Sequence, residues 1–548
     1  MKIISEFKTR SSFIFFIFLA IYSILAINLY LIQVWNNQKF INLAKKQYQV
    51  TVTNYPPRGL IKDRSGKILA FNKEKLSAFV LPKQIESPEK TFAFLKEHFP
   101  AAYVRLKQSN NKHFIFVKRK LNNKEIELIK NSEIVDLKFI KENSRFYTSN
   151  SLGPIIGITD IDNNGQFGIE AIFNKQLAGE PTTLALEMDA RSGHFYFGKS
   201  TTEEGIEPKD IQLTIDKDLQ FLAYEELKDT VKEVGAKEGF VIIIDPSNGH
   251  ILSMVQYPSF QPNNVTQLEL EKTKNKITTD AYEFGSVMKT FVALAALEEG
   301  VINPEDIIDC EDSLFGKING MKFSTWKAQG KIPFSEVFEK SNNIGMAKVA
   351  QKLGPILYDY YVRLGFGKKT GLELLGEQAG YITPPDKWSK RSLISLSFGY
   401  EIRATLLQLA NAMSIIANDG YLVKTKLLYS KEKDSKEKLF SQKSIKQIKE
   451  LLHNTVQRGT AFKASINGYN VMGKTGTANL LVNNQYSPTK NIYTFAGILE
   501  MDEYKRVIVV SIKESNKEQT FASTIAVPLF EKVAEKALIH DKMIHNLH

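Results

Sequence analysis

The stretch GSVMKTFVALAALEEG, residues 285–300, joins a reactive side-chain pair to a continuous apolar run. The apolar residues and the glycine at position 300 predict a buried helix that begins at Ser286 and ends at a C-cap glycine. Ser286 and Lys289, three residues apart, project from one face of such a helix. Burial and the positive end of the helix lower the pKa of a lysine placed there. Ser286 is therefore the predicted nucleophile and Lys289 its base.

Two later stretches complement this pair: Ser341-Asn342-Asn343 and Lys474-Thr475-Gly476-Thr477. In this order the motifs supply a serine nucleophile, an amine that deprotonates it, a proton relay and a cationic strand for a carboxylate. Together they are typical of an acyl transferase that opens amides through a covalent serine ester. No single motif is specific, because Ser-x-x-Lys recurs, for example at Ser324/Lys327, and Lys-Thr-Gly recurs at 369–371.

The setting distinguishes the later Lys-Thr-Gly from the earlier one. The residues on both sides of Lys474 carry little charge, and we expect an edge strand there. On such a strand Thr475 and Thr477 share one face, and Gly476 between them lets a peptide lie alongside without a clash. The earlier copy follows the turn-like segment 366–368, and we expect it to be structural.

The chain after residue 210 has the pattern of helices packed on an antiparallel sheet, an α+β fold. The segment 213–216 opens this part and leads into a long amphipathic helix through Val234. A buried strand then turns at residues 246–249 and returns as its hairpin partner. The expected strands are residues 240–245, 251–255, 494–499 and 507–512.

The N-terminus predicts a membrane anchor. Residues 13–35 are almost wholly apolar and carry no charge, and about 20 such residues cross a bilayer as a helix. Lys2, Lys8 and Arg10 precede the apolar run, so the positive-inside rule places residues 1–12 in the cytoplasm and the rest outside. A cleaved signal peptide is the competing interpretation, but its apolar core would be shorter and no small-x-small cleavage site follows.

The segment between the anchor and the catalytic part has a mixed pattern of short strands and polar helices. Residues 54–70 predict an extended approach, a strand and a tight Ser-Gly turn. We therefore expect four parts: a cytoplasmic tail, residues 1–12; a single transmembrane helix, 13–35; an elongated mixed α+β pedestal, 36–210; and the catalytic domain, 211–540.

Composition narrows the choice of function. The 548 residues carry a net charge of +12, but the lysines are dispersed among acids and no nucleic-acid motif is present, so we expect no nucleic-acid partner. The one cysteine, Cys310, lies in an acidic segment without nearby histidines. No spacing of Cys, His or carboxylates resembles a metal site, and we expect neither a metal nor a cofactor.

With these motifs assembled, the chain resembles a class B penicillin-binding protein, and more narrowly the division-specific peptidoglycan D,D-transpeptidase of the FtsI type. The likeness runs from the anchor to about residue 530. In the pedestal, which corresponds to the family's dimerisation domain, it rests on Arg58-Gly59-Leu60-Ile61-Lys62-Asp63-Arg64 and on Gly168-Ile169-Glu170. In the transpeptidase domain, expected to be serine β-lactamase-like, it rests on Tyr257-Pro258-Ser259-Phe260 and Ser397-Phe398-Gly399-Tyr400.

The resemblance implies a role for each motif residue. Ser286 would attack the penultimate D-Ala carbonyl of a stem peptide ending in D-Ala-D-Ala, and Lys289 would take its proton. Ser341 would relay a proton to the leaving amine, and Asn343 would hold the substrate amide and Lys289. The terminal carboxylate would bind Lys474, Thr475 and Thr477 around Gly476. The backbone N–H groups of Ser286 and Thr477 would form the oxyanion hole, worth about 3 kcal/mol per donor.

The same resemblance implies the setting. The protein would be a single-pass protein of the inner membrane, with a cytoplasmic N-terminus and a periplasmic catalytic domain at the division septum. Its expected partners are peptidoglycan stem peptides, β-lactams, the membrane, a polytopic septal glycosyltransferase of the FtsW type and other divisome proteins. Phe284, where the family usually has proline, bears on the shape of the cleft. Glu401 and Ala522-Ser523-Thr524 stand where glycine is common.

Several alternatives stay open at this point. A β-lactamase or a β-lactam-sensing receptor uses the same three motifs, although neither needs a domain-sized pedestal. A carboxypeptidase would use the same acyl-serine mechanism, and an elongation-type transpeptidase shares the architecture. A chain with an idle site could instead be a structural component of the division machinery.

Overall fold

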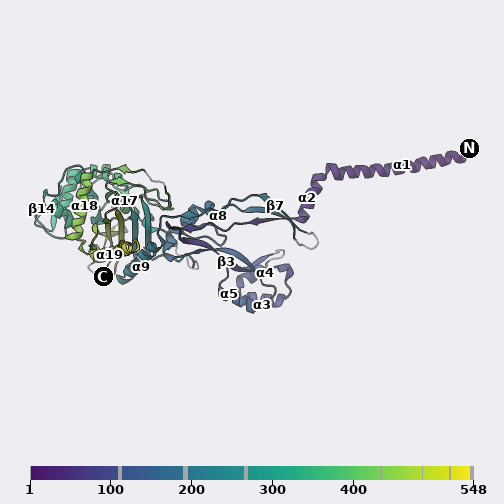
Figure 1. Ribbon diagram of the computed structural model, residues 1–548, viewed down its shortest axis with the longest axis horizontal. Coiled ribbons are helices and arrows are strands. Elements are labelled where there is room, and N and C mark those ends of the chain that lie inside the picture. Colours follow the sequence, from purple (N-terminus) through teal and green to yellow (C-terminus); the bar gives the residue numbers. More distant parts are fainter. Residues whose placement is uncertain are drawn as a thin grey trace. The chain divides into compact units, whose positions relative to one another are not determined.

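The computed structural model describes residues 2–108, 114–188, 195–264, 270–431, 435–483, 485–517 and 520–543. Within these ranges the chain forms two compact units (Figure 1). Residues 1–57 and 178–208 make the first unit, and residues 58–177 and 209–548 make the second.

The first unit contains the apolar N-terminal helix and a three-stranded antiparallel sheet in the order β1-β6-β7. One helical span, Lys8–Trp35, is long and apolar enough to cross a membrane, and none of its window is buried in protein. The predicted span 13–35 lies inside it, although the helix itself begins earlier, at Lys2. The elements are α1 (Lys2–Tyr30), the π-helical turn η1 (Leu31–Trp35), α2 (Asn37–Tyr48), β1 (Gln49–Asn54), β6 (Thr182–Met188) and β7 (Phe195–Glu203).

The N-terminal part of the second unit is built on the long strand β3, which pairs with β2, β4 and β5, while β2 pairs in parallel with β8. Its helices α3, α4 and α5 bury an apolar cluster against one end of β3 and β4. The elements are β2 (Ile61–Lys62), β3 (Ile68–Val80), η2 (Pro82–Gln84), α3 (Pro88–His98), α4 (Pro100–Lys107), β4 (Ile115–Lys118), α5 (Asn123–Asn131), β5 (Lys138–Tyr147), η3 (Asn150–Leu152), α6 (Gly153–Ile156), α7 (Gly168–Ile172), α8 (Asn174–Ala178) and β8 (Ile211–Gln212).

The two pedestal motifs quoted above meet in a buried ion cluster. Glu170 accepts from Arg58 Nε at 2.6 Å with one carboxylate oxygen and from Arg145 Nε at 2.6 Å with the other. Arg58 Nη2 also donates to the Glu170 carbonyl at 2.8 Å. All three side chains are at most 3% exposed. Because a buried charge is tolerated only when it is paired and hydrogen-bonded, this cluster fixes segments 112 residues apart.

The catalytic part is a five-stranded antiparallel sheet in the order β10-β9-β21-β20-β19, covered by helices on both faces (Figure 1). Alternate residues of β9 explain the layers, since successive strand residues point to opposite faces. Val241 and Ile243 join the core formed with α9 and α19, whereas Ile242 and Ile244 join the core that contains α12 and α17.

The predicted helix, hairpin and late strands are confirmed. The elements are α9 (Lys217–Glu233), β9 (Glu238–Asp245), β10 (His250–Tyr257), α10 (Leu270–Thr273), α11 (Lys276–Thr279), η4 (Gly285–Met288), α12 (Lys289–Glu298), β11 (Ile307–Asp309), β12 (Phe315–Ile318), β13 (Met321–Ser324), β14 (Lys331–Pro333), α13 (Phe334–Glu339), α14 (Asn343–Leu353), α15 (Ile356–Arg363), β15 (Tyr381–Ile382), η5 (Pro385–Lys387), α16 (Ser392–Ser397), β16 (Ile402–Arg403), α17 (Leu406–Ala417), β17 (Tyr421–Leu422), β18 (Glu437–Lys438), α18 (Gln442–Gln457), η6 (Phe462–Ala464), β19 (Asn470–Val482), β20 (Gln485–Met501), β21 (Tyr504–Lys513) and α19 (Ala522–His540).

Candidate active site

Ser286 lies on the 3₁₀ turn η4, and the regular helix α12 begins at Lys289 rather than at the serine. Every residue of α12 from Lys289 to Leu297 is buried, which explains the continuous apolar run. The turn is pressed against strand β19: a Cβ on Gly476 would lie 2.3 Å from the Phe284 carbonyl oxygen. Glycine at 476 therefore lets the third motif approach the nucleophile.

Lys289 is fully buried and is the hub of the first two motifs. Its amine donates to the Ser341 carbonyl at 2.8 Å and to Asn343 Oδ1 at 2.6 Å, and it lies 3.2 Å from the hydroxyl oxygen of Ser341. Desolvation, and then the charge of nearby Lys474, hold the pKa of Lys289 well below its usual value. Among the described residues, none of its hydrogen-bond partners is a carboxylate, so the uncharged amine is favoured. Its two N–H groups then donate to the two carbonyl oxygens, and its lone pair faces the Ser341 hydroxyl.

The second motif forms the entry to helix α14. Ser341 has a left-handed backbone (φ +55°), an uncommon conformation for a residue other than glycine. Asn342 caps α14 by accepting from Gly345 N at 3.0 Å, and it is fully buried. Asn342, the middle residue of the motif, therefore has a structural role. Asn343 is held by its Nδ2, which donates to the Ser324 carbonyl at 2.8 Å, and its Oδ1 faces Lys289.

The third motif lies on β19, which is the edge strand of the sheet as predicted. Lys474 is fully buried, and among the described residues its Nζ has no hydrogen-bond partner. It lies 5.7 Å from the ring centroid of Phe338, and burial lowers its pKa to about 7. Thr475 Oγ1 shares a hydrogen bond of 2.8 Å with Thr460, and Thr477 Oγ1 accepts from Ala522 N at 3.1 Å.

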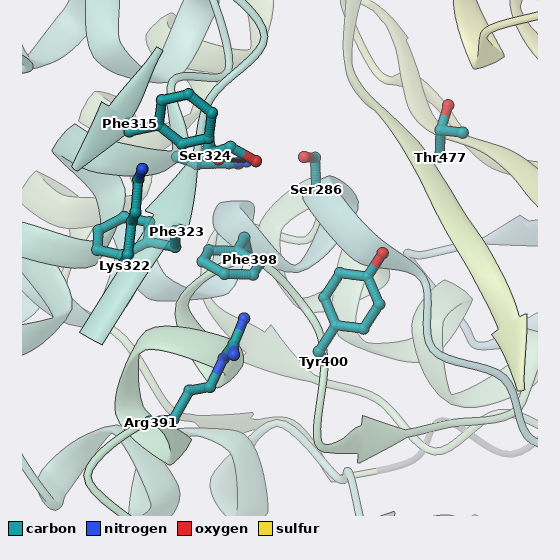
Figure 2. Close-up of a pocket in the computed structure, with 10 residues that line it drawn as sticks. Ser286, Phe315, Lys322, Phe323, Ser324, Arg391, Phe398, Tyr400 and Thr477 are labelled. Atoms are coloured by element: carbon teal, nitrogen blue, oxygen red, sulfur yellow. Dashed lines mark hydrogen bonds between the residues drawn. The ribbon is translucent and has the colours of Figure 1, made fainter. Parts of the chain in front are cut away.

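One cleft of about 490 Å³ brings residues of all three motifs together. Figure 2 shows Ser286 at its centre with Thr477 to one side and an aromatic and basic group to the other. The residues that line it are Ser286, Phe315, Lys322, Phe323, Ser324, Asn343, Arg391, Phe398, Tyr400 and Thr477.

The earlier Lys-Thr-Gly, residues 369–371, closes a turn, in line with the structural role expected of it. Glu377, which is 5% exposed, accepts from Thr370 N and Thr370 Oγ1 at 2.6 Å each and from Gly371 N at 3.1 Å. The motif is thus a carboxylate-capped turn. Phe284 is buried and packs near Tyr282, and it is not among the residues that line the cleft.

Two other reactive groups lie outside the cleft. Cys310 is buried and free, and burial raises the pKa of its thiol to about 11. Asp216, Asp218 and His540 come within 4.8 Å of one another. His540 bonds to Asp216 at 3.2 Å and to Asp541 at 2.9 Å, and these bonds raise its pKa to about 10. Through these bonds the group joins α19 to the N-cap of α9 as an ion-pair cluster.

Of the motif residues predicted from the sequence, Ser286, Asn343 and Thr477 line one cleft and Lys289 contacts the second motif, while other lining residues were not predicted. Lys322 and Arg391 stand in no recognisable motif, and no local signal marks them as cleft residues. The sequence did not indicate that Arg145 belongs to the pedestal ion cluster, because its partner, Glu170, is 25 residues away. Glu170 lies in one of the two quoted pedestal motifs and binds Arg58 of the other.

Comparison with known families gives two matches that cover most of the chain. Residues 239–535 match the penicillin binding protein transpeptidase domain. Residues 53–213 match the penicillin-binding protein dimerisation domain. The first match alone covers more than half of the 548 residues.

Proteins with similar sequences belong to the same group of enzymes. The chain is 30% identical over 492 residues to the probable peptidoglycan D,D-transpeptidase PbpC of Pseudomonas aeruginosa, covering 88% of this chain and 86% of the other. It is 30% identical over 531 residues to the peptidoglycan D,D-transpeptidase FtsI of Buchnera aphidicola, covering 92% and 91%. It is 28% identical over 563 residues to stage V sporulation protein D of Bacillus subtilis, covering 97% and 85%.

Penicillin-binding protein 3 of Mycobacterium tuberculosis, complexed with ampicillin, matches in fold with a TM-score of 0.71 at 22% identity, covering 91% of this chain and 98% of the other. The transpeptidase domain of Burkholderia pseudomallei penicillin-binding protein 3 matches with a TM-score of 0.56 at 27% identity, covering 61% and 98%. The chain therefore belongs to the class B penicillin-binding proteins and is a serine peptidoglycan D,D-transpeptidase.

Proposed function

We propose that Ser286 is the acylated nucleophile of this transpeptidase and that uncharged Lys289 is its base. The observation that supports this most strongly is the burial of Lys289 against Ser341 and Asn343, with no carboxylate among its hydrogen-bond partners in the described part of the chain. An uncharged amine at this point can take the Ser286 proton at neutral pH.

The proposed reaction begins on a stem peptide that ends in D-Ala-D-Ala. Ser286 Oγ attacks the penultimate D-Ala carbonyl while its proton passes to Lys289. The oxyanion is held by the backbone N–H groups of Ser286 and Thr477, at about 3 kcal/mol per donor. Ser341 then relays a proton to the departing D-Ala amine as the amide bond breaks, which leaves the acyl-serine ester. An amine of a neighbouring stem attacks this ester, forms the cross-link and frees Ser286.

The third motif is assigned to the terminal carboxylate. Lys474 is buried without a hydrogen-bond partner among the described residues, so an incoming carboxylate would satisfy it and favour its charged form. Thr475 and Thr477 add hydroxyls to this site, and Gly476 keeps the strand edge open to the peptide backbone. Asn343 would hold the substrate amide as well as Lys289.

The cellular role is proposed from the family type. We assign the chain to septal cross-linking during division, with the anchor spanning the inner membrane, the tail 1–12 in the cytoplasm and the domains 36–210 and 211–540 in the periplasm. An FtsW-type glycosyltransferase and other division proteins would be its partners. Depletion in cells should produce filaments if the role is septal, and rounded cells if it belongs to elongation.

A fluorescent penicillin tests the chemistry and separates the alternatives. The detergent-solubilised protein should carry a label that lasts many minutes, and the Ser286→Ala variant should carry none. Label lost within seconds would instead make the protein a β-lactamase. A Ser286→Ala variant that still supported division would assign the chain a structural role with an idle site. Purified donor and acceptor stems should yield cross-linked dimers, whereas release of D-Ala without dimers would mean carboxypeptidase activity.

A further inference from the structure

Two basic residues of the cleft take no part in the three motifs. Lys322 lies on strand β13 and Arg391 immediately precedes helix α16, and both line the same cleft as Ser286. Among the described residues that line this cleft, none is acidic. The side chains that line the cleft therefore carry a net positive charge.

Neither side chain is used to hold the fold together. Among the described residues, no ion pair or side-chain hydrogen bond is found for Arg391, and Lys322 only lies over the ring of Phe315, with 4.1 Å from Nζ to the ring centroid. Both residues are exposed. Apart from that ring contact, neither positive charge is paired with an anion among the described residues, so both are available to a ligand.

Their position relative to Ser286 limits what they can bind. Figure 2 shows Lys322 and Arg391 on the side of Ser286 away from Thr477, with the Arg391 guanidinium directed toward Phe398. The strand that carries Thr477 and Lys474 is assigned above to the terminal carboxylate. An anion at Lys322 and Arg391 must therefore be a different group, on the acyl side of the bond that Ser286 attacks.

We propose that Lys322 and Arg391 form a subsite for a second carboxylate of the donor stem peptide, carried on a side chain that precedes the scissile bond. This inference rests on the proposed function of Ser286. The Arg391 guanidinium can bind a carboxylate through two parallel hydrogen bonds, and Lys322 adds a second positive charge to the same cleft. Phe398 and Phe315 line the same cleft and give it apolar surface next to the two charges.

Two penicillins that differ by one carboxylate provide the test. Benzylpenicillin and carbenicillin share the ring system, and carbenicillin adds a carboxylate to the acyl side chain. The second-order rate of Ser286 acylation is measured for each with the full-length protein. Arg391→Ala should lower the carbenicillin rate relative to the benzylpenicillin rate by about five- to tenfold, and Arg391→Glu by more. The effect should shrink in 1 M salt.

The neighbouring Lys390 gives a matched control, because it is exposed but does not line the cleft. Lys390→Ala removes the same charge and should leave the ratio of the two rates unchanged. Donor peptides with the side-chain carboxylate free or amidated extend the test: Arg391→Ala should raise KM for the free acid only, with kcat preserved.

The outcomes are distinguishable. A ratio unchanged in Arg391→Ala, or an equal fall for both penicillins, would overturn the subsite while leaving Ser286 as the nucleophile. An equal change in Lys390→Ala would reduce the effect to general surface charge and would also overturn it. Failure of both penicillins to acylate the wild type would overturn the proposed function and this inference with it.

Discussion

Buried charge is arranged in opposite ways in the pedestal and in the active site. In the pedestal, Arg58 and Arg145 share the two carboxylate oxygens of Glu170, so each cation has an anion within 2.6 Å. In the active site, Lys289 and Lys474 are equally buried, but neither has a carboxylate partner among the described residues. In the described part of the chain, the two regions bury their cations equally well, but only the pedestal pairs them with an anion.

This contrast distinguishes a cluster that stabilises the fold from residues that carry out the reaction. Arginine stays protonated and binds bidentately, so a paired arginine cluster is a fixed connector. Lysine loses its proton when it is desolvated without a partner, and it then becomes a base or an unfilled cation site. We expect the pedestal cluster to hold structure at no cost to catalysis, and the lysines to support catalysis at a cost to stability.

Replacing the base should have the largest effect. Lys289→Met keeps the length and burial of the side chain but removes the amine. Acylation of Ser286 by benzylpenicillin should fall by about 10⁴-fold, because the serine loses its proton acceptor. Stopped-flow acylation measures the rate, and thermal unfolding should show a fold at least as stable as the wild type. A loss of less than tenfold would show that another group is the base.

Breaking the pedestal cluster should come next. Glu170→Gln leaves two buried arginines without an anion and should lower the free energy of unfolding of this part by about 3–5 kcal/mol. Exposed Glu127→Gln, on α5, is the matched control and should change it little. Denaturant titration with limited proteolysis of the pedestal reads out the effect. Acylation per folded molecule should stay within about twofold of the wild type. A larger loss would mean that the cluster also serves the chemistry.

Lys474→Met should weaken catalysis and strengthen the fold together. The carboxylate site loses its cation, and acylation should fall by about 10²–10³-fold. The pKa of Lys474 is about 7 when folded and near 10.5 when unfolded, so between these values the unfolded chain binds more protons. Wild-type stability should therefore rise with pH from 7 to 10, and the variant should lack this contribution and be more stable near pH 7 by about 2–4 kcal/mol. Equal pH slopes in the two proteins would contradict a depressed pKa.

The smallest effect is expected at the carboxylate-capped turn. Glu377→Gln removes the charge that accepts from Thr370 and Gly371, and should lower the free energy of unfolding by about 1–2 kcal/mol. Acylation should not change, because this Lys-Thr-Gly only closes a turn. A tenfold loss of acylation would contradict the division of roles between the two copies of the motif.

Sequence pattern was sufficient for the parts that depend on local chemistry. The apolar run after Lys289 predicted a buried helix, and the low charge around Lys474 predicted an edge strand, because both signals lie within one element. The residues around each Lys-Thr-Gly also distinguished the two copies, since one lies among uncharged residues and the other follows a turn-like segment. The one adjustment at the nucleophile is the 3₁₀ turn η4, since close packing against β19 tightens the first turn of the helix.

Features set by distant pairing could not be predicted in this way. The Arg58–Glu170–Arg145 cluster joins three elements, and the left-handed backbone of Ser341 depends on its tertiary setting. Phe284 was expected to bear on the shape of the cleft because it stands where the family usually has proline, yet its side chain is buried and is not among the residues that line the cleft. Lys322 and Arg391 reach the cleft only because a hairpin and a helix end meet there.

The central claim is that Ser286 is activated by a lysine that desolvation keeps uncharged. The direct test is the pH dependence of Ser286 acylation by benzylpenicillin from pH 5 to 10, with Ser286→Ala as the blank. A depressed pKa of Lys289 predicts a rate that falls at low pH, as Lys289 takes up a proton, and that does not rise above pH 7, where Lys474 loses its own proton. A lysine of ordinary pKa, near 10.4, would be almost fully protonated at pH 7. A rate that instead climbed about tenfold per pH unit from pH 7 to pH 10 would contradict the account.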